Sequence, residues 1–222
     1  MTLNISVSEE IRTACPIFSG AAVFASVQNT AYNKELWDEI NLFTAEYATT
    51  NTFETIKQTN SIAATRAVYK KLGKDPNRYR PSSESLLRRI VKNMPLYQID
   101  TLVDLVNLVS IKSGYSIGGF DSSKIEGTEL ILGVGKADEP YEGIGRGILN
   151  IEGLPIYRDS VGGIGTPTSD NERTKIDLDT KQFLGIINGY SGKEGLEEAV
   201  NHMEYLLEKY VDAKNISIIY FQ

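Results

Sequence analysis

The chain has 222 residues, of which 41% are hydrophobic and 23% are charged, a composition typical of a soluble globular protein. Its net charge of −6 argues against strong, general binding to duplex nucleic acid, because such binding depends on basic surfaces, although a small local basic patch stays open. No apolar run approaches the ~20 residues that cross a bilayer, and the first residues lack a basic start and an apolar core, so we expect no membrane helix and no signal peptide.

The one cysteine and the one histidine restrict the possible chemistry. Cys15 has no partner for an intramolecular disulfide, which fits a reducing compartment, so we expect a cytoplasmic protein in which Cys15 only packs. His202 lies beside, not on, the apolar stripe of segment 194–211, so we expect a solvated histidine and no histidine-dependent triad. No cluster has the spacing of zinc ligands and no nucleotide fingerprint is complete, so we expect neither a metal nor another cofactor.

The N-terminal half predicts one strand region followed by helices. Residues 1–30 are strand material, strongest at 21–27. Apolar residues at helical spacing predict helices over 34–48 and 61–72, the second ending at Gly73. The section 74–81 contains two prolines and should be irregular.

Two further helices follow. One should start at Ser82 or Ser83, with a serine side chain capping its free N–H groups. The other covers 101–113, is strongly apolar and is expected to be central. Its polar residues Asp104, Asn107 and Ser110 are three apart and share a face. Asp104 and Asn107 should anchor neighbouring loops, with direct contact to a ligand as the alternative.

The C-terminal half predicts short strands between glycine-rich turns, then a helix and a final strand. The strands are expected at 115–120, 128–134, 148–151, 154–158 and 183–188, and the last at 216–221. The helix over 194–211 should open with a capping box of Ser191 and Glu194. With no linker or repeat, one α+β domain over 1–222 is the simplest interpretation.

Two segments contain residues suited to chemistry. In the sequence NRYRPSSESLLRR (77–89), Arg78 and Arg80 precede a helix N-terminus and together with it could hold an anion, or they could simply fix the loop. The glycine-rich stretch 162–165 leads into a loop over 166–174 that is rich in hydroxyls and acids. That loop could line a pocket, bind an amino group or orient a water molecule, or it could be an exposed loop.

These segments resemble the B3/B4 editing domain of the phenylalanyl-tRNA synthetase β chain. NRYRPSSESLLRR is typical of free-standing members, and LVDLVN (102–107) with GGFD (118–121) is similar to the synthetase pattern VDxxNYVxxxxGQPxHAFD. A looser similarity is the turn 162–165 before Ser169 and Glu172. The resemblance covers roughly 65–200.

The resemblance implies an α+β domain of mixed sheets with packed helices that binds the aminoacyl end of tRNA. In the synthetase this domain hydrolyses tyrosine wrongly attached to the phenylalanine tRNA, so the implied activity is aminoacyl-tRNA deacylation in trans. Positioning a water and stabilising the oxyanion suffice for an activated ester, so no covalent nucleophile is needed. The implied partners are tRNA or aminoacyl-tRNA, or a free amino acid.

The resemblance also implies the site. Glu172 is the expected catalytic residue, and the expected substrate-binding residues are Arg78, Arg80, Ser82, Asn107, Gly118, Thr168, Ser169, Asp170 and Thr174. One departure stands out, because Gly118 replaces the histidine of the synthetase pattern. The alternative function is therefore a binding module without catalysis, for an amino acid, a nucleotide or an RNA end.

Overall fold

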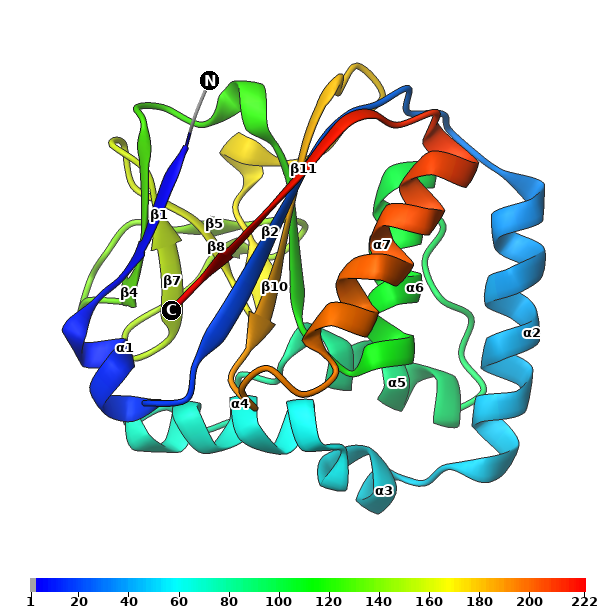
Figure 1. Cartoon of the computed structure of the whole chain (residues 1–222). Coiled ribbons are helices and arrows are strands. Elements are labelled where there is room, and N and C mark those ends of the chain that lie inside the picture. The colour runs from blue at the N-terminus through cyan, green and yellow to red at the C-terminus, as the bar shows by residue number, and fades with distance from the viewer. Residues whose placement is uncertain (1–2) are drawn as a thin grey trace.

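The computed structural model describes residues 3–222. Figure 1 shows a five-stranded sheet on one side, a four-stranded sheet in the middle and most of the helices on the other side, with α4 along the lower edge. Each layer buries one apolar face against the next, which is how an α+β domain makes its core.

The two large sheets differ in how their strands run. The five-stranded sheet has the order β1 (Asn4–Val7), β4 (Glu129–Val134), β7 (Pro155–Arg158), β8 (Gly163–Thr166) and β9 (Ser169–Asp170). In it β1 and β4 are parallel and the other neighbours are antiparallel. The four-stranded sheet is antiparallel, in the order β11 (Lys214–Phe221), β2 (Ser19–Ser26), β10 (Gln182–Gly189) and β3 (Ile117–Asp121). A small ribbon pairs β5 (Glu142–Gly143) with β6 (Gly147–Ile148).

The α-helices of the described chain are α1 (Glu9–Ala14), α2 (Lys34–Thr50), α3 (Phe53–Gln58), α4 (Asn60–Lys71), α5 (Ser82–Val91), α6 (Thr101–Ser113) and α7 (Leu196–Val211). Single turns of 3-10 helix, η1 (Ser122–Lys124) and η2 (Glu172–Thr174), follow β3 and β9.

One core lies between the helices and the four-stranded sheet, and a second lies between the two sheets. Strand β2 serves both, since Ala21 and Val23 belong to the first core and Ala22 to the second. This double burial explains why its sequence is a continuous run of small apolar residues instead of an alternating one.

The predicted fold class is confirmed, because the chain forms an α+β domain of mixed sheets with packed helices. The helices predicted at 34–48, 61–72, 101–113 and 194–211 all form, and the last uses the predicted stripe, including Met203 and Leu207, as its buried side. Strands form at the predicted places except at 148–151, where β6 ends at Ile148. The prediction of strand material over 1–30 is wrong at Glu9–Ala14, which form helix α1. The short helix α3 and the strands β5, β8 and β9 were not predicted.

Both predicted side-chain caps are wrong. Helix α5 does begin at Ser82, but neither predicted serine caps it: the N–H of Ser82 donates to the carbonyl of Pro167, and that of Ser83 to the hydroxyl of Ser116 at 3.5 Å. Helix α7 begins after Gly195, and Ser191 lies 3.3 Å from the hydroxyl of Tyr115 instead of at the helix end.

Three polar predictions concern packing. Cys15 is buried and its thiol contacts the carbonyl oxygen of Tyr190, so its packing role is confirmed. Asp104 accepts hydrogen bonds from the indole of Trp37 and the N–H of Ile99, which confirms it as a loop anchor. The prediction of a solvated His202 is only partly right, because the ring is half-buried and lies 4.0 Å from Glu39.

In residues 3–222 no helix has the length and apolar character that crossing a membrane requires.

Candidate functional site

A cavity of about 460 Å³ lies where α6 meets β3, β9 and the segment 175–178. We call it the Asp170 cavity. Its lining combines apolar side chains with hydroxyls, one amide, carboxylates and one ammonium group. These residues are Ser82, Ile99, Asp100, Val103, Val106, Asn107, Ser110, Ile117, Gly119, Ile144, Thr166, Ser169, Asp170, Lys175, Ile176, Asp177 and Leu178.

Helix α6 supplies one wall. Val103, Val106, Asn107 and Ser110 recur at the spacing of a single helix face and all line the cavity. Asp100 fixes the start of this helix by accepting the N–H of Val103 at 2.8 Å. The helix therefore presents the amide of Asn107 to the cavity from a wall that is otherwise mostly apolar.

Asp170 is the carboxyl group of the cavity lining whose protonation state changes near neutral pH. Its Oδ2 accepts a hydrogen bond of 3.1 Å from the N–H of Gly119, and burial raises its pKa to about 7. Among the residues that the structure describes, no group donates a hydrogen bond to its Oδ1. Asp170 thus combines a free oxygen, a pKa near neutrality and a position on the cavity wall, a combination typical of functional carboxyl groups.

The other two carboxylates of the lining are engaged in holding the fold. Asp100 caps α6, and Asp177 binds the ammonium group of Lys124 at 2.6 Å. The same lysine lies 3.7 Å from Asp121. These contacts tie the segment after η2 to the end of β3.

Glu172, the predicted catalytic residue, lies at the rim and does not line the cavity. It accepts from the N–H of Gly145 at 3.2 Å and pairs with the ammonium group of Lys175 at 2.5 Å. The hydrogen bond from Lys175 lowers the pKa of Glu172, so at neutral pH this carboxylate is ionised and already paired with the ammonium group of Lys175. Lys175 itself lines the cavity, so Glu172 reaches the site through that lysine.

Large apolar side chains surround the opening. Ile99, Ile144 and Leu178 are 58%, 40% and 52% exposed and all belong to the lining. Exposed apolar groups grouped at the mouth of a cavity are typical of a surface that a ligand covers.

Four of the residues predicted from the sequence meet in this cavity, namely Ser82, Asn107, Ser169 and Asp170. Two lie behind the wall. The hydroxyl of Thr168 pairs with that of Tyr69 at 2.9 Å, and Thr174 is fully buried with no hydrogen bond to its hydroxyl from the described residues.

Gly118 lies in β3 next to the lining residue Gly119. A Cβ atom at Gly118 would be 2.6 Å from Cζ of Phe120 and 3.4 Å from Oδ1 of Asp170. The phenylalanine ring therefore occupies the space that a side chain at position 118 would need.

Arg78 and Arg80 are exposed in the loop between α4 and α5 and do not line the cavity. The interactions that brace this loop come from Arg66 instead. Its guanidinium binds the carbonyl of Pro76 at 3.1 Å, the side chain of Asn77 at 2.8 Å and the buried carboxylate of Glu84 at 2.8 Å. Much of the NRYRPSSESLLRR segment is thus a folded brace.

Sequence reasoning missed Lys175, Asp177 and the apolar lining. Lys175 follows directly after the hydroxyl-rich loop, so extending that loop by one residue would have found it. The apolar residues gave no signal, because Val103 and Val106 belong to the same helical pattern as the core residues of α6.

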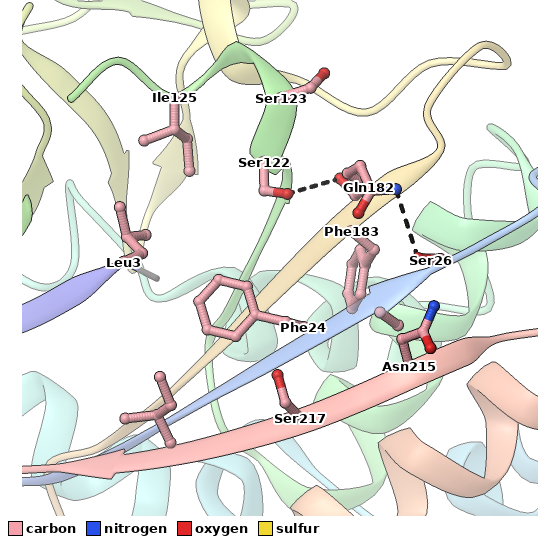
Figure 2. Close-up of a pocket in the computed structure, with 12 residues that line it drawn as sticks. Leu3, Phe24, Ser26, Ser122, Ser123, Ile125, Gln182, Phe183, Asn215 and Ser217 are labelled. Atoms are coloured by element: carbon pink, nitrogen blue, oxygen red, sulfur yellow. Dashed lines mark hydrogen bonds between the residues drawn. The ribbon is translucent and has the colours of Figure 1, made fainter. Parts of the chain in front are cut away.

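A second cavity, of about 470 Å³, lies at the far end of the four-stranded sheet (Figure 2). Figure 2 shows Phe24 facing the hollow, with Ser122 beside Gln182, whose carbonyl oxygen accepts the serine hydroxyl at 3.2 Å. Within the described residues its lining contains no charged side chain, so it lacks the titratable group that distinguishes the Asp170 cavity.

In residues 3–222 no three His, Cys, Asp or Glu side chains are grouped to hold a metal ion.

The fold and the cavity can now be compared with known proteins. A family model described as B3/4 domain matches residues 64–217, which is more than half of the chain, so the chain belongs to the B3/4 domain family. This confirms the resemblance found in the sequence. No curated protein matches the chain.

Among solved structures, one that matches is an N-terminal fragment of the phenylalanyl-tRNA synthetase β-subunit from Pyrococcus horikoshii. The identity is 14% and the TM-score 0.49. The match covers 98% of this chain and 50% of the fragment, so the chain spans about half of that structure.

Proposed function

We propose that the chain binds the aminoacyl end of a charged tRNA in the Asp170 cavity and hydrolyses the ester of a wrongly attached amino acid. The observation that carries the proposal is Asp170, a carboxyl group with a pKa of about 7 on the wall of a cavity in a B3/4 domain. A general base is most effective when its pKa is close to the working pH.

The chemistry needs few groups, because an aminoacyl ester is already activated. Asp170 takes a proton from water, the water oxygen attacks the ester carbonyl carbon, and the bond to the ribose oxygen breaks as that oxygen is protonated. The hydroxyls of Ser82 and Ser169 and the amide of Asn107 are the groups of the lining that suit hydrogen bonding to the substrate. Lys175, a cation at the same cavity, suits stabilisation of the oxyanion.

In this proposal Glu172 has an indirect role. Its ion pair with Lys175 fixes the ammonium group at the rim, which makes it a positioning residue. The expectation that Glu172 itself orients water remains the competing prediction, and Asp170 is favoured because it alone of the two lines the cavity.

A non-catalytic binding module is the second candidate. It is favoured by Gly118, which stands where the synthetase pattern has a histidine and where Phe120 leaves no room for one. In that case the cavity would hold a free amino acid, its ammonium group on Asp170 and its side chain against Val103 and Ile176.

A deacylation panel tests the first proposal. Purified protein is incubated with tRNAs carrying different wrong amino acids, and release of the amino acid is followed beside a phenylalanyl-tRNA synthetase that edits. We expect hydrolysis of at least one substrate; none, with the synthetase active, contradicts the proposal. Thermal-shift titration with free amino acids and nucleotides tests the second candidate, which requires a saturable shift without turnover.

A further inference from the structure

The basic residues of this acidic chain are concentrated in one segment. Residues 66–92 contain nine of the 23 lysines and arginines but two of the 29 acidic residues, so the segment carries a net charge of +7 and the remainder −13. This segment forms the second half of α4, the loop that follows and all of α5. The net charge of the whole chain therefore conceals a strongly basic part.

Few of these charges are neutralised within the molecule. Glu84 takes up the two cations that are paired, Arg66 at 2.8 Å and Arg88 at 3.7 Å. Among residues 3–222, no carboxylate lies within 4.0 Å of the exposed cations Lys70, Arg78 and Arg80.

We call Lys70, Arg78 and Arg80, together with Arg66 between them, the basic surface. Arg66 joins its parts, because its side chain starts on α4 and binds Asn77 in the loop. Lys70 lies one turn from Arg66 on the same helix, and Arg78 is the neighbour of Asn77. In Figure 1 α4 lies along the lower edge of the molecule.

The basic surface leads to the Asp170 cavity. Arg80 is two residues before Ser82, which lines the cavity, so their Cα atoms are at most about 7 Å apart. Arg78 is four residues before Ser82, at most about 14 Å. Between them lies the half-buried ring of Tyr79, which packs against a small apolar cluster and has the ammonium group of Lys74 3.9 Å and the guanidinium of Arg78 5.6 Å from its centroid.

We propose that the basic surface binds the phosphates of the RNA strand whose end enters the Asp170 cavity. The inference rests on the proposed function in one respect, namely that the end of the strand carries an aminoacyl group. Arginine side chains bind phosphate through paired N–H groups. An RNA strand is favoured over an anionic membrane because Arg80 is two residues before a residue that lines the cavity, and because the chain is a B3/4 domain.

The proposal is tested by binding of a labelled uncharged tRNA, followed by fluorescence anisotropy between about 25 and about 200 mM salt. With three phosphate contacts the plot of log Kd against log salt should have a slope of about 2. In Arg78→Gln/Arg80→Gln the slope should fall to about 0.7 and Kd should rise about 100-fold at the lowest salt. Lys181→Gln/Lys193→Gln removes two exposed lysines elsewhere and should change Kd less than about twofold.

Three outcomes would overturn the proposal. The first is equal binding by the arginine variant and the wild type. The second is an equal loss in the lysine control, which would mean that net charge alone matters. The third is binding of phosphatidylserine vesicles without binding of RNA. The proposed function is tested separately with the amino acid ester of adenosine, which has no phosphodiester. Failure to hydrolyse it, with arginine-dependent RNA binding intact, would remove the hydrolase and leave the basic surface standing.

Discussion

The N–H of Gly119 on β3 donates a hydrogen bond of 3.1 Å to Oδ2 of Asp170 on β9. These two strands are the last strands of different sheets, β3 of the four-stranded and β9 of the five-stranded one. An edge strand has backbone N–H groups that form no hydrogen bond to a neighbouring strand, and here one of them binds the carboxylate of Asp170. The site is therefore built where the two sheets meet, and the bond fixes one oxygen of Asp170 while the other stays free.

The first prediction concerns Asp170 as the base. In Asp170→Asn the amide oxygen can still accept from Gly119, so the fold should persist while the base is lost. We expect kcat/KM for deacylation to fall at least about 100-fold, the usual contribution of a general base. Single-turnover deacylation of the best substrate from the panel measures it, and circular dichroism confirms folding.

Glu172→Gln provides the comparison within the same loop. Because Glu172 acts only by holding Lys175 at the rim, we expect a loss below about tenfold. The reverse order, with Glu172→Gln near zero activity and Asp170→Asn active, would make Glu172 the base.

The second prediction concerns stability and pH. The folded-state pKa of Asp170 is raised from 3.8 to about 7 by burial, so between these values the folded state keeps a proton that the unfolded state has lost. Stability from this group is thus complete below pH 3.8 and decreases as the pH rises towards 7. Asp170→Asn removes this charge, so its melting temperature should equal that of the wild type only below about pH 3.8 and should exceed it increasingly up to pH 8. Parallel melting curves at all pH values would contradict the assigned environment of Asp170.

The sequence predicted the long elements because their apolar spacing is set by burial. In α7 the stripe that includes Val200 and Met203 is the buried side, as its spacing requires. The helices α1 and α3 have six residues each, too few to display a period, and β8 (GIGT) has no polar alternation because both of its faces are buried. The caps failed for a different reason, since tertiary partners such as Pro167 replaced local ones.

The sequence predicted which loop contributes to the candidate site, but not which residues of that loop face the cavity. The loop 166–174 does reach the cavity, yet only some of its side chains face it, because Thr168 in the turn before β9 and Thr174 in η2 are buried in the protein. Which hydroxyl faces a cavity depends on the chain reversal at Pro167, and no pattern in the sequence records it. Arg66, which braces the recognised segment, lies outside that segment and was not found.

The third prediction concerns the space at Gly118. A Cβ there would be 2.6 Å from the ring of Phe120, so Gly118→Ala should lower the free energy of unfolding by about 1–3 kcal/mol. Gly162→Ala is the matched control, because a Cβ at Gly162 has no atom within 4 Å. Both changes reduce the freedom of the unfolded chain equally, so the difference between them in urea denaturation isolates the contact. Equal stability of the two variants would show that Phe120 moves aside, and that a histidine at position 118 is possible.

The last prediction concerns the brace between α4 and α5. Glu84 is completely buried and Arg66 is its near partner at 2.8 Å, with Arg88 further away at 3.7 Å. Arg66→Met leaves that carboxylate poorly compensated, so the free energy of unfolding should fall by about 3–5 kcal/mol. Lys34→Met removes a pair whose side chains are 75% and 61% exposed and should change it by less than about 1 kcal/mol. The double variant Arg66→Met/Glu84→Met should regain part of the loss, because no buried charge is then left alone. A double variant less stable than Arg66→Met would mean that Glu84 stabilises the fold through Arg88 rather than through Arg66.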